Sequence, residues 1–349
     1  MKQIDTGLPA QPRRYSGING LRAFSAIGII LMHVLANGGY ALNSQIANRL
    51  ILSFTDLVFL FMLISGFSMC CGYYDKFVNN RIDLGKFYGK RFQKIWPYFA
   101  MLCLLDVVIA PSRESLYEAF ANLTMMFGLL PDPNLSVIGV GWFLGLVFVF
   151  YMVFPFFCYL LSDRRRAWFS FAVALVLSKV CEVYFDVGRV NLLYSGVFFL
   201  GGGLVFLYRE QILVAACKFR WLLLLGCAAA AACYYALGAS VPVMLVACVL
   251  LLAVAMGAKE KGILSNRVTE FLSNISLELY LGHMVIYRVL EKLNLLKLFG
   301  NGVVSYLVAA VATVVGTVVF AVVATWALGK AQQWLQKIPC CKPNKEKGE

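Results

Sequence analysis

Long apolar segments recur along the whole chain and alternate with short polar ones. A transmembrane helix needs about 20 mostly apolar residues, and ten segments of this chain approach or exceed that length. They cover residues 18–37, 50–73, 95–110, 141–161, 167–185, 190–208, 221–238, 241–257, 270–290 and 303–329. The pattern predicts an all-α polytopic membrane protein with about ten transmembrane helices.

The segment 116–130 is the ambiguous stretch in this pattern. It is apolar enough to form an interfacial or re-entrant helix, and the predicted span before it, 95–110, is the shortest of the ten. If 116–130 crossed the membrane fully, the orientation of every later segment would be inverted.

The composition agrees with a membrane protein. Hydrophobic residues make up 61% of the 349 residues, and the mean hydropathy is +0.76. Only 14% of the residues are charged, against roughly 25% in soluble domains, which excludes an ordinary soluble protein. Most of the 11 cysteines, Cys103 and Cys158 among them, lie in apolar runs, where cysteine acts as a small hydrophobic residue rather than a disulfide partner.

The positive charge is distributed as membrane topology requires. With the N-terminus in the cytoplasm, 23 of the 31 Lys and Arg residues fall on the cytoplasmic side and six on the other. Positive residues concentrate in cytoplasmic loops, so both termini are expected inside the cell. This distribution explains the net charge of +13 without a nucleic-acid partner. Residues 1–17 then form a cytoplasmic segment, 18–329 the transmembrane domain and 330–349 a basic cytoplasmic tail.

The first predicted span carries an arginine and a histidine in an apolar run. Eleven positions turn a helix by about 1100°, so Arg22 and His33 share one face and lie about 16 Å apart along the axis. Charge in hydrocarbon is costly. This face is therefore expected to line a polar path from the cytoplasm, although Arg22 by itself also fits a side chain that snorkels to the membrane surface.

The other histidine of the chain lies in the ninth span. Ser276, Tyr280, His283 and Tyr287 recur at helical spacing and form a second polar stripe. His283 lies about as deep in its span as His33 does in the first, so the two imidazoles can face one cavity and move a proton. The alternative is two unrelated histidines that serve packing.

Other charged residues also fall inside predicted spans. Lys179 and Glu182 are spaced to neutralise each other, and Asp106 lies near a helix end. Asp56 begins "DLVFLFMLISGF", in which Ser65 and Gly66 allow close helix approach. Intramembrane ionisable residues are candidates for function. Besides Arg22 and the two histidines, these candidates are Asp56, Asp106, Lys179, Glu182 and Glu278.

The loop predicted for residues 74–94 is strongly basic. Topology and attraction to anionic lipid account for such a loop, and so does a cytoplasmic site for a phosphate-rich ligand. "KRFQKIWP" places Arg91 and Lys94 one helical turn apart where the third span begins.

Four stretches, in order, resemble motifs of the acyltransferase-3 family of integral membrane acyltransferases. "GLRAFSAIGIILMH" matches its Arg-x10-His signature onto Arg22 and His33. "DLVFLFMLISGF", "GKRFQKIWPYF" and "SLELYLGHMVI" resemble its second-span, basic and late Tyr-Leu-x-His motifs. The resemblance runs from about residue 15 to 330. Lys94 stands where arginine is commoner, and Val147 stands where many members carry a glutamate.

The resemblance implies acyl transfer from cytoplasmic acetyl-CoA, or another acyl-CoA, to a hydroxyl or amine of a cell-surface glycan or lipid-linked sugar. It implies a protein of the bacterial cytoplasmic membrane that contacts membrane lipid and needs no metal. The surface polysaccharide, lipopolysaccharide, glycolipid and small secreted metabolite all remain open as acceptors.

The residue types fit that chemistry. Phosphates of CoA suit Arg22, Arg91 and Lys94. The acceptor hydroxyl needs a base, for which His33 is the first candidate, as direct base or acyl carrier. His283 is expected to orient the acceptor or stabilise the oxyanion together with Tyr280. The remaining candidates for substrate binding are Ser276, Asp56 and Trp142, although Trp142 and Tyr151 also fit the aromatic belt at the membrane surface.

Three other interpretations are compatible with the polar residues. Buried His, Asp, Glu and Lys also build proton relays, so a proton-coupled exporter of a glycan precursor is the main alternative, although no inverted repeat is visible. The other class of multispan O-acyltransferases centres on one late histidine paired with asparagine, which the first-span His33 disfavours. A purely structural or sensory protein is the third alternative.

Overall fold

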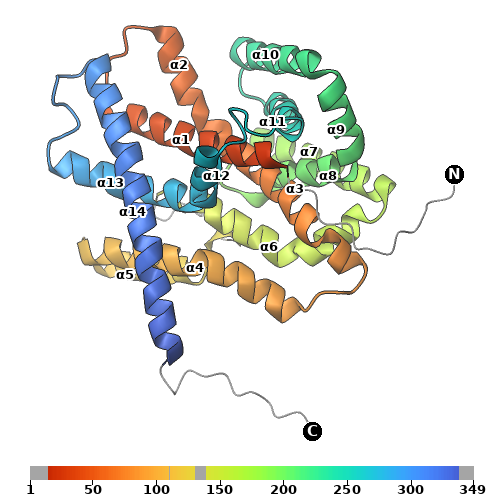
Figure 1. The fold of residues 1–349 in the computed structure, drawn as a ribbon, viewed down its shortest axis with the longest axis horizontal. Coiled ribbons are helices and arrows are strands. Elements are labelled where there is room, and N and C mark those ends of the chain that lie inside the picture. The colour runs from red at the N-terminus through yellow and green to blue at the C-terminus, as the bar shows by residue number, and fades with distance from the viewer. Residues whose placement is uncertain (1–14, 110, 130–138, 338–349) are drawn as a thin grey trace.

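The computed structural model describes residues 15–109, 111–129 and 139–337, and these residues form helices without any strand (Figure 1). The helices are α1 (Ser16–Gly38), α2 (Gln45–Ser53), η1 (Phe54–Asp56), α3 (Leu57–Val78), α4 (Leu84–Ile109), α5 (Arg113–Leu123), η2 (Phe127–Leu129), α6 (Trp142–Leu161), α7 (Arg164–Tyr184), α8 (Leu192–Leu207), α9 (Arg209–Lys218), α10 (Arg220–Leu237), α11 (Val241–Met256), α12 (Arg267–Asn274), α13 (Ser276–Lys292) and α14 (Val303–Lys337).

The architecture is that of an all-α integral membrane protein, as the hydrophobic pattern predicts. Within the described residues, seven helices are long and apolar enough to cross a membrane, and the pair α8 and α9, bent by 77°, makes an eighth if it counts as one span. The shorter helices α11 and α13 occupy the two other predicted spans. The number ten and the orientation stay predictions.

The ends of the predicted domains fall close to helix ends. α1 begins at Ser16, two residues before the predicted first span, and α14 continues to Lys337, past the predicted boundary at 329. Most of the predicted N-terminal segment and the last part of the predicted tail lie outside the described residues.

The ambiguous segment does not form a spanning helix in its described part. α5 has 11 residues and rises about 16 Å, about half of the 30 Å hydrocarbon core. Its Leu116, Tyr117 and Phe120 are exposed, while the Trp96 indole of α4 donates to the Leu123 carbonyl at 2.9 Å. This arrangement suits a helix that lies along the membrane interface.

The basic segment predicted as a loop over 74–94 is mostly helical. α3 continues to Val78 and α4 already begins at Leu84, so only 79–83 connects them. The short connection is capped by Asp83, whose Oδ1 accepts from the Lys86 backbone at 3.0 Å; this hydrogen bond holds the pKa of the exposed carboxyl below its usual range. Arg91 and Lys94 therefore project from a rigid helix.

The ninth predicted span, 270–290, is broken near its start. α12 ends at Asn274 and α13 begins at Ser276, with Ile275 between them. The Ser276 hydroxyl donates to the Ser273 carbonyl at 2.8 Å, which satisfies one backbone acceptor freed by the break. The irregular backbone around Ile275 leaves N–H and C=O groups without helical partners. At membrane depth such groups have to face protein or a polar cavity.

α1 is the central helix of the bundle. It contacts α2, α3, α11, α12, α13 and α14, and glycines allow the closest of these approaches. A Cβ at Gly17 would meet the Ala255 carbonyl, and the Gly20 backbone N–H donates to the Leu264 carbonyl at 3.1 Å. The helix that carries Arg22 and His33 is thus enclosed by protein rather than by lipid.

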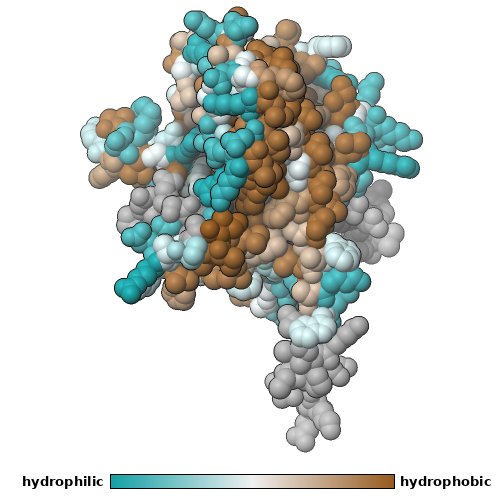
Figure 2. Space-filling view, turned by 90° about the vertical axis from the view of Figure 1, so that its left-hand side faces the viewer, coloured by the Kyte–Doolittle hydropathy of each residue, from teal (hydrophilic) through white to brown (hydrophobic). Residues whose placement is uncertain are grey.

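α14 lies at the periphery and presents an apolar face. Figure 2 shows a broad apolar surface on the side of the molecule where α13 and α14 lie. Up to Trp326, the exposed side chains of α14 are apolar except Thr325: Val303, Val304, Leu307, Val308, Val311, Val315, Val319, Val322, Val323 and Trp326. Such a face is suited to lipid chains.

α3 and α8 are packed closely through two glycines. A Cβ at Gly66 would meet the Phe199 carbonyl oxygen, and a Cβ at Gly202 would meet the Leu63 carbonyl oxygen. Small residues permit such close backbone approach in membrane proteins. The close approach expected from Ser65-Gly66 is confirmed, and it fixes the helix that carries Ser65 and Ser68.

We expect Gly202→Ala to lower the free energy of unfolding by about 1–3 kcal/mol, the usual cost of overpacking. Gly196→Ala is the matched control on α8, because nothing lies within 4 Å of the place that its added methyl group would take; alanine is favoured there by roughly 0.5–1 kcal/mol. Thermal unfolding of the two variants in detergent tests this. Equal midpoints would contradict the close α3–α8 packing.

Candidate functional site

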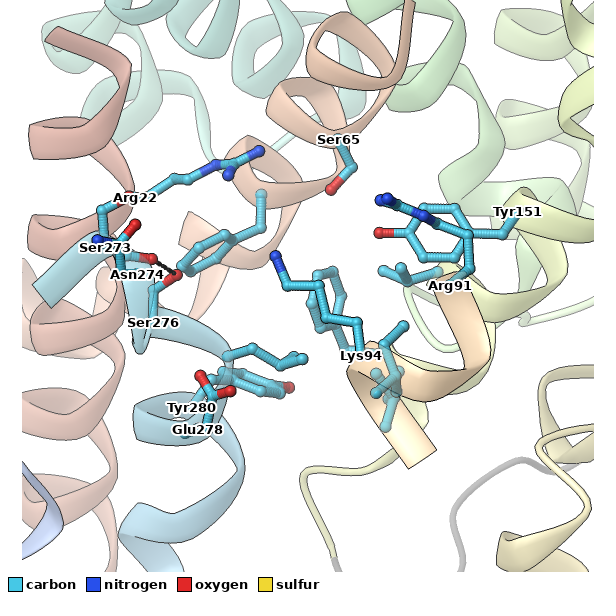
Figure 3. Close-up of a pocket in the computed structure, with 16 residues that line it drawn as sticks. Arg22, Ser65, Arg91, Lys94, Tyr151, Ser273, Asn274, Ser276, Glu278 and Tyr280 are labelled. Carbon is cyan, nitrogen blue, oxygen red and sulfur yellow. Dashed lines mark hydrogen bonds between the residues drawn. The ribbon is translucent and has the colours of Figure 1, made fainter. Parts of the chain in front are cut away.

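A polar cavity opens between α1, α3, α4, α6, α13 and the α12–α13 break (Figure 3). It encloses about 770 Å³, counting its open mouth. Its lining residues are Arg22, Phe61, Ser65, Arg91, Lys94, Ile95, Phe143, Leu144, Val147, Tyr151, Ser273, Asn274, Ser276, Leu277, Glu278 and Tyr280. The cavity therefore joins residues that are more than 250 positions apart in the sequence.

Three cationic side chains reach into the cavity from two helices, α1 and α4 (Figure 3). Arg22 donates to the Ser68 hydroxyl at 3.0 Å, and Arg91 donates to the Tyr73 hydroxyl at 2.8 Å. Lys94 forms no hydrogen bond or ion pair with any described residue, and the buried Arg91 Nε also has no partner. Donors of this kind can bind an anion that enters the cavity.

Aromatic rings hold the Arg91 guanidinium in place. It lies 5.1 Å from the centre of the Tyr73 ring and 5.9 Å from that of Tyr151, within the range of cation–π attraction. Tyr151 is thus part of the cavity wall and not of an aromatic belt at the membrane surface. Arg91 Nη1 also donates to the Met69 Sδ at 3.7 Å, so the donor left without a partner is the Nε–H group, which a ligand can accept from.

Three aromatic rings close the inner end of the cavity. The ring centres of Phe61 and Phe143 are 6.0 Å apart, and Tyr280 lies 5.2 Å from Phe143 and 6.5 Å from Phe61. The Tyr280 hydroxyl donates to the Val140 carbonyl at 2.9 Å. This aromatic trio, Phe61, Phe143 and Tyr280, forms the part of the cavity lining that is next to His283, through Tyr280.

The two histidines lie next to each other, as their matched depths predict, but neither is among the residues that line the cavity. Their ring centres are 5.0 Å apart, and Tyr280 lies 6.2 Å from His283. His283 is fully buried, and its Nδ1 lies 2.7 Å from the Tyr280 carbonyl oxygen. A carbonyl only accepts hydrogen bonds, so this contact assigns the proton to Nδ1. The His283 Nε2 is left as an acceptor and has no partner among the described residues.

His33 is the more accessible member of the pair. It is half-buried, whereas His283 is inaccessible. Asn37 on the same helix donates to the His33 carbonyl at 2.7 Å. Arg22 and His33 differ by eleven positions on the continuous helix α1, so their backbone positions are about 16 Å apart along its axis.

A fourth cationic side chain, that of Arg189, lies outside the cavity lining and near His33. Arg189, between α7 and α8, donates to the Thr55 hydroxyl and stands 5.7 Å from the centre of the Trp142 ring. Its charge acts on both His33 and Tyr280. Thr55 precedes α3, whereas Ser68, the partner of Arg22, lies farther along that helix, so the two guanidinium groups contact different levels of the bundle.

The structure brings most of the candidate residues together. Five of them, Arg22, Arg91, Lys94, Ser276 and Tyr280, line the cavity, and His33 and His283 form the pair next to it, through Tyr280. Trp142 lies outside the cavity lining, beside Arg189.

Asp56, a predicted substrate-binding residue, lies apart from the cationic cavity. Its Oδ2 accepts from the Tyr234 hydroxyl at 2.5 Å, in a separate, mostly apolar pocket of about 740 Å³ between α3, α10 and α11. The structure therefore does not bring Asp56 to the cationic cavity.

Two residues near the site were not among the predicted catalytic and binding residues, although Glu278 was one of the intramembrane candidates for function. Glu278 lines the cavity and Arg189 stands beside the histidine pair. A charged residue inside a span was the available signal for Glu278, while Arg189 looked like one of several basic residues in outer loops. Within the described part of the chain, no three His, Cys, Asp or Glu side chains gather in a metal-binding group.

Comparisons with known proteins identify the family. Searches of curated proteins and of solved structures found no match to the chain. The family model described as an acyltransferase domain, acyltransferase-3, matches residues 15–326, which include every residue of the cavity and both histidines. The chain belongs to the acyltransferase-3 family and is a membrane acyltransferase.

Proposed function

We propose that the protein transfers an acetyl group from acetyl-CoA at the cytoplasmic side of a bacterial inner membrane to a hydroxyl of an extracytoplasmic glycan or lipid-linked sugar. The observation that carries the proposal is the alignment of the cationic cavity and the histidine pair along α1. The cations suit the phosphates of the donor, and the imidazoles suit a reaction that moves a proton.

The length of an acyl-CoA supports this alignment. About 14 covalent bonds separate the thioester carbon from the nearest phosphorus, and in an extended chain they span roughly 17 Å. The axial distance between Arg22 and His33 is about 16 Å. A donor with its pyrophosphate at Arg22, Arg91 and Lys94 therefore brings its thioester to the level of the histidines, once its acyl end has passed the aromatic trio.

The proton balance assigns a role to His33. The acceptor hydroxyl loses its proton as its oxygen attacks the thioester carbon, and the imidazole of His33 takes that proton. The carbon–sulfur bond then breaks, and the CoA thiolate leaves and receives a proton, so that the products are the acyl ester and free CoA. The alternative in which His33 carries the acyl group itself has the same overall balance.

His283 is suited to support His33. Its Nδ1–H is held by the Tyr280 carbonyl, so the Nε2 lone pair is oriented and available for a proton. The single O–H group of Tyr280 already donates to the Val140 carbonyl, so it is not available to an oxyanion. Stabilisation of the oxyanion by His283 therefore requires a protonated Nε2, which donates only after it has received a proton.

The acceptor is proposed to approach from the Arg189 end. Trp142 offers an aromatic face for a sugar ring, and Arg189 offers donors for sugar oxygens or a phosphate. Arg189 is near enough for its charge to act on His33, and Trp142 lies beside Arg189, outside the cavity lining. Donor and acceptor would then meet at His33 from opposite sides.

We expect Arg91→Gln and His33→Ala to separate donor binding from chemistry. Loss of charged hydrogen bonds in Arg91→Gln should raise the Kd for acetyl-CoA about 10-fold or more. His33→Ala should leave that Kd little changed and lower turnover by about 10²- to 10⁴-fold. Equilibrium binding of radiolabelled acetyl-CoA and the rate of CoA release in nanodiscs measure both.

Lys90→Gln is the matched control, because Lys90 is exposed on the same helix and does not line the cavity. It should change neither quantity. A folded parent that neither binds nor turns over acetyl-CoA or longer acyl-CoA donors would contradict the proposal and favour the transporter, which leaves its substrate chemically unchanged.

We expect Arg189→Gln to impair the acceptor side alone. Transfer of label from acetyl-CoA to the lipid and glycan fraction of host membranes should fall about 10-fold, while the Kd for acetyl-CoA stays the same. Arg49→Gln is the control, since Arg49 donates to the carbonyl of Tyr235, a residue of the separate pocket that contains Asp56. An equal loss of acetyl-CoA binding in Arg189→Gln would contradict the two-sided arrangement.

A further inference from the structure

Glu278 is an unexplained group in the cationic cavity. It is the sole carboxylate among the described lining residues, and its side chain is only 8% exposed. Its Oε2 is buried and has no hydrogen-bond partner in the described structure. The Tyr98 hydroxyl, 3.3 Å away, donates to the Glu278 backbone carbonyl and not to its carboxylate.

A buried carboxylate oxygen without a donor is costly. Lys94 is near enough for its charge to act on Glu278. The two side chains nevertheless form no ion pair in the described part of the structure. Charge compensation by Lys94 therefore leaves the hydrogen-bonding capacity of Oε2 unused. A ligand that fills the cavity can supply the missing donor if it carries N–H or O–H groups as well as phosphate.

The position of Glu278 along α13 indicates which part of a ligand it would meet. Glu278 precedes His283 by five residues on the continuous helix α13, which corresponds to about 7.5 Å. In an acyl-CoA, the two amide nitrogens of the arm lie roughly 5 Å and 10 Å from the thioester carbon when the arm is extended. The level of Glu278 falls between these two amides.

We propose that Glu278 is the residue that recognises the amide-bearing arm of the donor, with its carboxylate accepting a hydrogen bond from an arm N–H while the cations hold the phosphates. This inference rests on the proposed function, because it requires a thioester donor in the cavity. Its consequence is selectivity: Glu278 distinguishes a donor with an amide arm from one with an arm of equal length that lacks N–H groups.

The test compares acetyl-CoA with two analogues in which a methylene group replaces one or the other arm N–H. The parent is expected to bind acetyl-CoA roughly 10-fold or more tightly than the analogue that lacks the recognised N–H. Glu278→Ala should bind acetyl-CoA and both analogues equally. Glu278→Gln keeps the shape and an acceptor oxygen but loses the charge, so it should retain a smaller preference.

Glu291→Gln is the matched control, since Glu291 lies on the same helix, is exposed and does not line the cavity; it should bind as the parent does. Failure of the parent to bind acetyl-CoA would overturn the proposed function. Binding by the parent with no preference among the three ligands, or with a preference that Glu278→Ala and Glu278→Gln both keep in full, would overturn the role of Glu278 alone.

Discussion

The guanidinium of Arg22 has to be kept out of hydrocarbon, and much of the bundle follows from that requirement. A charge in the membrane interior has to face protein or a polar cavity. α1 is accordingly enclosed by six other helices, and Ser68 of α3 accepts from Arg22. The close packing of α3 on α8 through Gly66 and Gly202 holds that acceptor in place.

The same helix sets the geometry of the proposed reaction. Because α1 is continuous, the separation between its arginine and its histidine is fixed by helical rise and does not depend on loops. The aromatic trio of the cavity lining offers a way to exclude water from the thioester. Water exclusion strengthens the electrostatic interactions inside a site and limits hydrolysis of a reactive group.

Irregular backbone is concentrated where it borders the cavity. The break between α12 and α13 places Ser273, Asn274 and Ser276 in the lining. The Ser276 hydroxyl donates to the Ser273 carbonyl, which the break leaves without a helical partner. Non-helical backbone at membrane depth is tolerated only where protein or water surrounds it. The ninth span is therefore broken at the place where a polar wall is available.

The sequence by itself determined the fold class, the positions of most helices and the shared face of Arg22 and His33, because hydrophobic length and helical periodicity are local properties. It also indicated the two histidines as neighbours through their equal depth. Only the tertiary structure decided that Asp56 pairs with Tyr234 in another pocket, that Trp142 stands beside Arg189, and that Glu278 shares a cavity with three cations. These relations depend on how helices distant in sequence rotate and pack against one another, which no local pattern encodes.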